Sequence, residues 1–199
     1  MEHVASMFEK LRNSVNSHVG MSKDEFNLVT TFFTPKKLRK RQYILQAGDI
    51  CKWLIFLERG CLRLYSLDDD GKEHVLWLAI EGWWMTDLVS FQEQMPSSKN
   101  IDALEDSELL LMSPESLEKL STAVPKWDRY FREITDKEFR VALTRLSDFV
   151  GASAEDRYLN FLDLYPDIFQ RIPLHQIASY LGITPQSLSR IRRDLAERK

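Results

Sequence analysis

Residues 172–190 read IPLHQIASYLGITPQSLSR, and this stretch decides the fold of the C-terminal part of the chain. Apolar residues recur at helical spacing before Gly182, and a second apolar stripe follows it. Gly182 suits the positive φ that ends a helix, and Thr184 followed by Pro185 is a typical helix start. The stretch therefore predicts two short helices joined by a tight turn, which is a helix-turn-helix.

The second of these helices keeps its polar side chains off the apolar stripe, at the end that enters the major groove in DNA readers of this type. Arg190 carries a planar fork that matches guanine O6 and N7, and Gln186 can bond adenine. We expect DNA contacts from His175, Thr184, Gln186, Ser187, Ser189, Arg190, Arg192 and Arg193. The alternative is an ordinary helical hairpin with a solvated basic face.

Charge is distributed unevenly along the chain. Its formal net charge is −3, which argues against a general binder of polyanions. Residues 185–199 instead hold five cationic side chains, Lys199 the last of them, against two anionic ones, a net charge of +3. Such a field suits a helix that lies against phosphates, although basic residues also complement the C-terminal end of a helix dipole.

The composition is that of a globular protein with ordinary cores. The chain has 199 residues and 44% hydrophobic content, and we expect two domains. We find no signal peptide and no apolar run long enough for a membrane span, so we expect a cytosolic protein. Cys51 and Cys61 are too few for a disulfide scaffold or a four-cysteine metal site, and we expect both to be buried or half-buried thiols.

The predicted secondary structure of the chain changes twice before the helix-turn-helix. Residues 1 to about 34 are expected to be helical, with a capping box from Ser22 to Glu25. From 38 to about 113 the chain forms short β-like runs that break at four glycines spaced twelve, eleven and eleven residues apart. This spacing is typical of antiparallel strands in a sandwich or barrel, and Asp70 with Gly71 marks the clearest hairpin.

A nearly heptad seam then runs from Pro125 to Gly151. Its members, which we expect at a dimer interface, are Trp127, Phe131, Ile134, Glu138, Ala142, Leu146 and Phe149. The alternative is that the seam covers the β-domain of its own chain, and one helix can do both. A dimer would place two recognition helices about 34 Å apart, which is one turn of DNA.

The order of these parts resembles the Crp-Fnr family of bacterial transcription regulators. The resemblance is carried by the segments 44–49 (ILQAGD), 54–60 (LIFLERG), 101–110 (IDALEDSELL), 154–162 (AEDRYLNFL) and 172–190. It implies an α+β fold with an N-terminal antiparallel β-roll (a jelly roll) and flanking helices. The implied domains are a cyclic-nucleotide-binding-like sensor at 1–124, a dimerisation helix at 125–151 and a DNA-binding domain at 152–199. The resemblance also implies a cytoplasmic homodimer that binds palindromic double-stranded DNA and acts on RNA polymerase.

The ligand chemistry departs from the family pattern. Cyclic-nucleotide-binding members hold the ribose with a Glu and the phosphate with an Arg, whereas Thr86, Asp87 and Ser97 stand at the corresponding places here. The cation that would pair with a buried phosphate is missing, and Lys99 offers a point charge in place of a fork. We therefore expect no response to cyclic AMP and no cofactor, which leaves the sensor empty or open to another small-molecule effector. The pocket residues are expected to be Trp83, Trp84, Thr86, Asp87, Ser97, Ser98 and Lys99.

The predicted helix-turn-helix at residues 172–190, called the reader below, also departs from the best-known members. They present Arg, Glu and Arg where this chain has Pro185, Gln186 and Arg190. The chain ends soon after this helix, so we expect no β-hairpin wing and modest affinity per half-site. A second hypothesis is a ligand-binding or protein-interaction module with a vestigial reader. We expect no enzyme and no metal site, because catalytic motifs and a His-x-His cluster are missing from the sequence.

Overall fold

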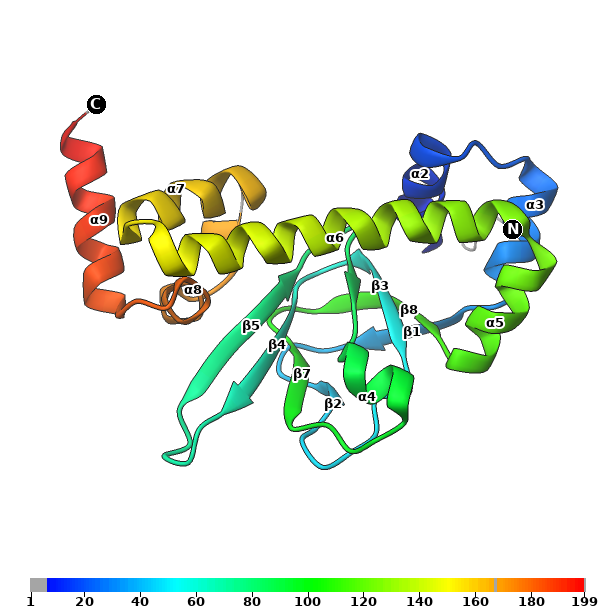
Figure 1. Cartoon of the computed structure of the whole chain (residues 1–199), viewed down its shortest axis with the longest axis horizontal. Helices are drawn as coiled ribbons and strands as arrows, with labels where there is room; N and C mark the ends of the chain where they lie inside the picture. The colour runs from blue at the N-terminus through cyan, green and yellow to red at the C-terminus, as the bar shows by residue number, and fades with distance from the viewer. Residues whose placement is uncertain (1–6, 167, 199) are drawn as a thin grey trace.

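The computed structural model describes residues 7–166 and 168–198. One long helix crosses the whole molecule above the strands, with the N-terminal helices at one end and the C-terminal helices at the other (Figure 1). The helices are α2 (Glu9–His18), α3 (Lys23–Thr30), α4 (Leu88–Glu93), α5 (Pro114–Ala123), α6 (Pro125–Gly151), α7 (Ala154–Leu164), the 3-10 turn η1 (Ile168–Gln170), α8 (Leu174–Leu181) and α9 (Pro185–Glu197). No described helix is both long and apolar enough to span a bilayer.

Two four-stranded antiparallel sheets form the β-roll. Their strands are β1 (Thr34–Leu38), β2 (Tyr43–Leu45), β3 (Leu54–Arg59), β4 (Leu62–Leu67), β5 (Glu73–Ala79), β6 (Trp84–Met85), β7 (Lys99–Ala103) and β8 (Ser107–Met112). The strand orders are β1-β8-β3-β6 and β2-β7-β4-β5, so β5 is an edge strand. The α+β architecture with an antiparallel β-roll is confirmed.

The hairpin predicted around Gly71 joins β4 to β5. Leu64 lies opposite Trp77 in its register, and the Asp68 carboxylate accepts hydrogen bonds from the backbone of Asp70 and Lys72. Gly71 has a φ of 76°, a backbone angle that residues with a side chain rarely adopt. The turn residues therefore fix the register that places alternate side chains of β4 and β5 on opposite faces.

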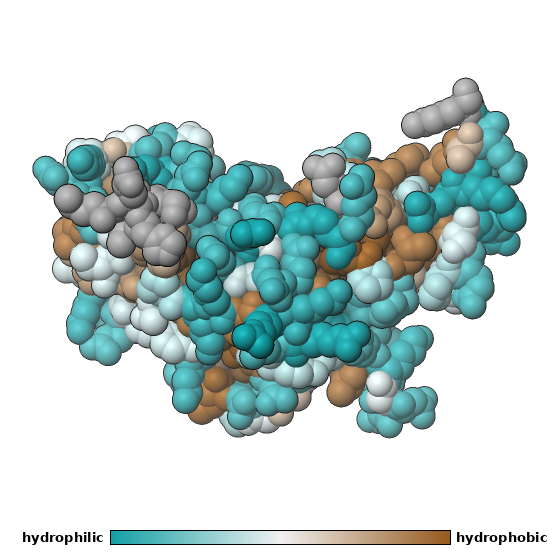
Figure 2. Space-filling view, turned by 180° about the vertical axis from the view of Figure 1, so that it is seen from behind, coloured by the Kyte–Doolittle hydropathy of each residue, from teal (hydrophilic) through white to brown (hydrophobic). Residues whose placement is uncertain are grey.

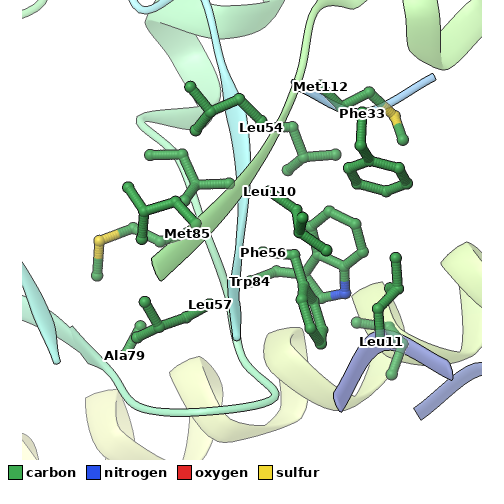
Figure 3. Packing of buried hydrophobic residues seen from close by; sticks show 14 of the residues in the cluster. Leu11, Phe33, Leu54, Phe56, Leu57, Ala79, Trp84, Met85, Leu110 and Met112 are labelled. Atoms are coloured by element: carbon green, nitrogen blue, oxygen red, sulfur yellow. The ribbon is translucent and has the colours of Figure 1, made fainter. Parts of the chain in front are cut away.

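The main core lies between the sheets and the first half of α6. The aromatic ring of Trp84 packs against Phe56 at 5.1 Å and against Trp127 at 6.0 Å between ring centroids. Tyr130 is fully buried, and its hydroxyl accepts a hydrogen bond from the Trp84 indole. Figure 3 shows Trp84 packed among Phe56, Leu110 and Leu11, which come from different elements. These contacts attach α6 firmly to the β-roll.

The predicted helices agree with the structure where it describes them. The helix expected from Pro125 to Gly151 has those bounds, with Pro at its first turn. The capping box is present in both directions, since Ser22 accepts from the Glu25 backbone and Glu25 accepts from the Ser22 backbone. The prediction for residues 1–6 lies outside the described residues. Cys51 and Cys61 are buried free thiols, as expected.

The C-terminal helices pack on the β-roll and share a second core with it. Buried aromatic residues of α7 and α8, Tyr158, Phe161 and Tyr180 among them, join Val75 and Leu78 of β5 in one cluster. Helix α8 lies against β5, while α9 stands at the outer end of the molecule (Figure 1). The β-roll therefore does not cover the helix on which the predicted DNA contacts lie.

Candidate nucleic-acid interface and sensor pocket

The turn between α8 and α9 has the geometry that the sequence predicts. Gly182 adopts a left-handed conformation with φ of 66° and ends α8. The Thr184 hydroxyl accepts a hydrogen bond from the Ser187 backbone N–H at 3.1 Å, and Pro185 takes the first helical position. A Cβ at Gly182 would lie 2.4 Å from Phe149 Cε1, so this turn also seats the end of α6.

Helix α9 divides into a buried and an exposed face. Leu188 and Ile191 are buried in the second core, whereas Gln186, Ser189 and Arg190 are exposed. Arg190 has no ion pair within residues 7–166 and 168–198. A free guanidinium on an open helix can meet the edge of a base in a groove.

The remaining hydroxyl and imidazole groups of the predicted set have different surroundings. The Thr184 hydroxyl is already bonded to the Ser187 hydroxyl as well as to its backbone, so Thr184 acts first as the N-cap. His175 is exposed in the first turn of α8, and its Nε2 lies 2.9 Å from the Gln176 amide nitrogen. Ser187 is half-buried, and its hydroxyl accepts a hydrogen bond from the Thr184 hydroxyl at the N-terminal end of α9.

The other basic side chains of α9 are held by neighbours. The guanidinium of Arg192 lies 5.1 Å from the centroid of the Phe169 ring. Arg193 lies 3.8 Å from Asp194, and exposed Arg198 pairs with Glu155 at 2.6 Å. Arg192 and Arg193 lie on the same helix as Arg190, Arg198 follows its last residue, and all three contribute to the positive field around Arg190. Lys199, which completes the basic end of the sequence, lies outside the described residues.

Arg63 of β4 holds α8 on the β-roll, and sequence reasoning missed this contact. Arg63 is 6% exposed, and its guanidinium binds Asp102 through two hydrogen bonds of 2.6 and 2.9 Å. It also binds Glu73 of β5 and donates to the Gln176 side chain of α8 at 2.7 Å. Burial alone would lower the pKa of Arg63, but the hydrogen bonds that it donates to Asp102 and Glu73 outweigh burial and raise that pKa.

Side chains from α6, from α8 and from the residue after α7 form hydrogen bonds with the free edge of β5. The Ser179 hydroxyl accepts from the Val75 N–H and donates to the Glu73 carbonyl. Arg145 of α6 donates to the carbonyls of Val75 and Leu76. The carbonyl of Leu78 accepts from the Tyr165 hydroxyl at 2.9 Å. The edge strand is thereby attached to α6 and α8 and to the residue that follows α7.

A pocket of about 800 Å³ lies between the β-roll and α6, mostly lined by apolar side chains. At its polar end Asp87, 4% exposed, pairs with Lys99 at 2.7 Å and accepts from the Ser97 hydroxyl at 2.6 Å. The lysine charge is thus already neutralised. Burial raises the pKa of Glu138, on the α6 wall, to about 7.

The structure brings together only part of the predicted pocket set. Trp84, Thr86, Asp87 and Lys99 line the cavity. Trp83 does not, because its ring stacks on Tyr165 at 5.3 Å in the second core. Ser97 is buried against Asp87, and Ser98 is exposed outside the lining. Within the described residues no three His, Cys, Asp or Glu side chains are grouped so that they could hold a metal ion.

The predicted seam on α6 has two different halves. Trp127 and Ile134 are buried in the core of their own chain, so the alternative interpretation describes this half, and Phe131 and Glu138 are half-buried beside them. Ala142, Leu146 and Phe149 are exposed. The second half carries further exposed apolar residues that the prediction omitted: Phe139, Leu143 and Val150.

Comparison with known proteins agrees with this architecture. The family model described as cyclic nucleotide-binding domain matches residues 35–123. The chain is 26% identical over 171 residues to the fumarate and nitrate reduction regulatory protein of Vibrio cholerae, which covers 78% of this chain and 66% of that protein. The chain thus spans just under two thirds of that relative's length.

Solved structures show the same fold over most of the chain. The catabolite activator protein of Thermus thermophilus aligns with a TM-score of 0.57 at 22% identity, over 93% of this chain and 87% of that one. FixK2 from Bradyrhizobium japonicum aligns with a TM-score of 0.68 at 20% identity, over 83% of this chain and 85% of that one. With the β-roll, the long helix and the helix-turn-helix in the same order, this chain has the fold of these proteins, and its residues 35–123 match the cyclic nucleotide-binding domain.

Proposed function

We propose that the protein is a transcription regulator that reads a palindromic DNA operator as a homodimer. The exposure of Gln186 and Arg190 on the outer face of α9 supports this most directly. Base-reading side chains must be free of the core and of carboxylate partners, and Arg190 meets both conditions within the described residues. We assign no catalytic role, and we place the protein in the cytoplasm, where it would reach DNA and RNA polymerase.

Dimerisation is proposed through the second half of α6. Phe139, Leu143, Leu146 and Val150 are each 49% exposed or more and recur at steps of four, three and four residues. This is the spacing of a coiled-coil seam, which buries such residues against a second copy of the helix. The seam continues directly into the helices of the reader, so a paired α6 would fix the separation of two α9 helices.

Selection of bound sequences from a random duplex pool tests the proposal. A dimeric reader selects an inverted repeat whose half-sites are centred about one DNA turn, roughly 34 Å, apart. A module with a vestigial reader, the second hypothesis, enriches no sequence even at low salt while it remains folded and dimeric. Enrichment of a single unpaired half-site would contradict the dimeric part of the proposal.

Replacing Arg190 with alanine should reduce the discrimination between the selected operator and random DNA by about 1–3 kcal/mol. Its exposed fork is the group best placed to bond two acceptors of one guanine. Fluorescence anisotropy on both duplexes at one fixed salt concentration measures the ratio. Arg193→Ala is the matched control, because a phosphate contact should weaken both duplexes alike. An equal loss on both duplexes in the Arg190 variant would remove its assignment to base reading.

Cyclic AMP is not expected to be the effector. Asp87 places a buried carboxylate at the polar end of the pocket, where a cyclic phosphate needs a cation, and Lys99 is already paired. We expect the melting temperature of the protein to stay unchanged in cyclic AMP up to millimolar concentrations, with adenosine monophosphate as the reference. A concentration-dependent rise with cyclic AMP alone would overturn this expectation.

A further inference from the structure

A second cavity lies where the β-roll half of the molecule meets the C-terminal helices, and it shares Arg145 and Phe149 with the sensor pocket. It is an open cleft with a volume of about 410 Å³, and its walls are formed by residues of α6, α7 and α8. On α6 it is lined by Val141, Thr144 and Asp148, each two residues before a member of the exposed seam. Two residues correspond to about 200° around a helix, so the cavity lies on the face opposite the seam. A partner helix on the seam would leave it open.

Among the residues that the structure describes, two arginines in this cavity have no carboxylate partner. Arg145 donates to the carbonyls of Val75, Leu76 and Tyr180, and its Nε is buried without a hydrogen-bond partner among the described residues. Arg157 donates to the carbonyls of Leu181 and Ala152. Within residues 7–166 and 168–198, neither forms an ion pair.

Two other arginines join the β-roll to the C-terminal helices, and both have the carboxylate partners that Arg145 and Arg157 lack among the described residues. Arg63 meets Asp102 and Glu73, and Arg171 meets Glu81 and Glu105. A guanidinium removed from water is costly unless an anion pairs with it, and the chain supplies such anions at these two places. At Arg145 it does not, and burial lowers the pKa of that group. The cavity therefore holds positive charge that the protein leaves uncompensated.

The remaining lining defines what would fit. Lys137 and Arg140 add to the two arginines, while the acidic residues of the wall are Asp148 and Asp163. Asp148 is already bonded to the Asn160 amide at 2.9 Å. Aromatic faces are contributed by Phe149, Phe161 and Tyr180, and the guanidinium of Arg145 lies 3.9 Å from the centroid of the Tyr180 ring. Such a site suits an organic anion with a flat apolar body.

From behind, hydrophilic residues cover most of the molecule, and the largest hydrophobic patch on that face lies toward the C-terminal helices (Figure 2).

Phe149 links the cavity to the reader. Its ring lies under both guanidiniums, 5.2 Å from Arg145 and 5.4 Å from Arg157, and against Gly182 in the turn. A molecule in the cavity would thus touch the helix that carries the seam and the helices that carry the DNA contacts.

We propose that the cavity between α6, α7 and α8 binds a small aromatic carboxylic acid, with Arg145 and Arg157 pairing its carboxylate. The site adjoins the pocket between the β-roll and α6 and shares Arg145 and Phe149 with it, whereas Arg157 lines the new site alone. Its occupancy does not depend on whether the protein reads DNA. The volume of the cavity, about 410 Å³, exceeds that of a two-ring acid and falls within the usual range of ligand sites, roughly 300–1,000 Å³.

Isothermal titration of the full chain with 1-naphthylacetate tests the site, with the neutral 2-(1-naphthyl)ethanol as the matched probe. We expect the acid to bind at least about tenfold more tightly than the alcohol, because only the acid supplies a charge for the arginines. Arg157→Gln should weaken binding of the acid by a similar factor, and Arg157→Lys by less, since lysine keeps the charge without the fork.

Two control variants locate the binding. Arg132→Gln removes an exposed cation from α6 outside the cavity and should change nothing, and Lys99→Gln removes a cation of the sensor pocket and should also leave binding intact. Should Arg157→Gln fail to fold, hydrogen exchange of the unaltered protein gives a second measurement: the acid should protect residues 141–165. Equal affinity for both probes, protection confined to residues 84–99, or loss of binding in the Lys99 variant would overturn the proposal.

Discussion

Replacing Arg63 with methionine is expected to lower the free energy of unfolding by about 3–5 kcal/mol. The substitution removes the cation from Asp102, which is 5% exposed, and leaves a buried carboxylate without its counterion. It also removes the bond to Gln176, through which the β-roll holds α8. Urea unfolding followed by tryptophan fluorescence measures the change.

Two control variants separate the effect of breaking the ion pair from the general effect of losing an arginine. Arg59→Met changes an exposed arginine at the end of β3 and should alter stability by less than about 0.5 kcal/mol. The double variant Arg63→Met with Asp102→Leu removes both charges and should recover much of the loss. A single Arg63 variant as stable as the unaltered protein would show that the cluster does not hold the two parts together.

Leu146→Glu is expected to separate the dimer and to weaken operator binding about 100-fold or more, because one half-site then binds alone. Leu146 is 62% exposed and lies in the middle of the apolar seam, so two glutamates would face each other across a paired α6. Analytical ultracentrifugation measures the mass of the protein, and anisotropy on the selected duplex measures its affinity.

Thr144→Glu adds the same charge to the opposite, exposed face of α6 and serves as the control. It should leave both the mass and the affinity for the operator unchanged. A Leu146 variant that stays dimeric would place the interface elsewhere on the molecule. A monomeric variant with full affinity would instead refute the need for two readers on one operator.

The sequence predicted best those features that depend on neighbours along the chain. The bounds of α6 follow from Pro125 and Gly151, and the turn of the helix-turn-helix follows from Gly182 and Thr184, because each residue satisfies a local backbone requirement. The exposure of Gln186 followed in the same way, from its position off the apolar stripe of one helix.

The contacts between the β-roll and the reader could not be predicted in this way. Arg63 and Gln176 are 113 residues apart, and an arginine in an alternating strand is normally read as a solvent-facing residue. Trp83 was expected in the sensor pocket, but the neighbouring Trp84 points to the main core and Trp83 meets Tyr165 on the opposite side. Adjacent residues of an extended segment face opposite ways, as Trp83 before β6 and Trp84 within it do, and only the packed structure shows which surface each side chain meets.

The seam of α6 shows an intermediate case. Its spacing predicted an apolar stripe, and the stripe exists, but spacing alone cannot say what covers it. Trp127 packs into its own chain while Leu146 stays exposed, because the β-roll meets the second half of α6 through Arg145 and leaves the apolar stripe there uncovered. The sequence pattern is the same in both halves, and the difference comes from the tertiary structure.

The capped edge of β5 bears on how the protein avoids aggregation. An uncovered edge strand offers unpaired N–H and C=O groups to any other chain, and intermolecular sheet growth starts from such edges. Ser179, Arg145 and Tyr165 occupy those groups on Glu73, Val75, Leu76 and Leu78. A fragment cut after α6 would lose Ser179 and Tyr165, two of the three protecting side chains, so we expect it to aggregate more readily than the full chain.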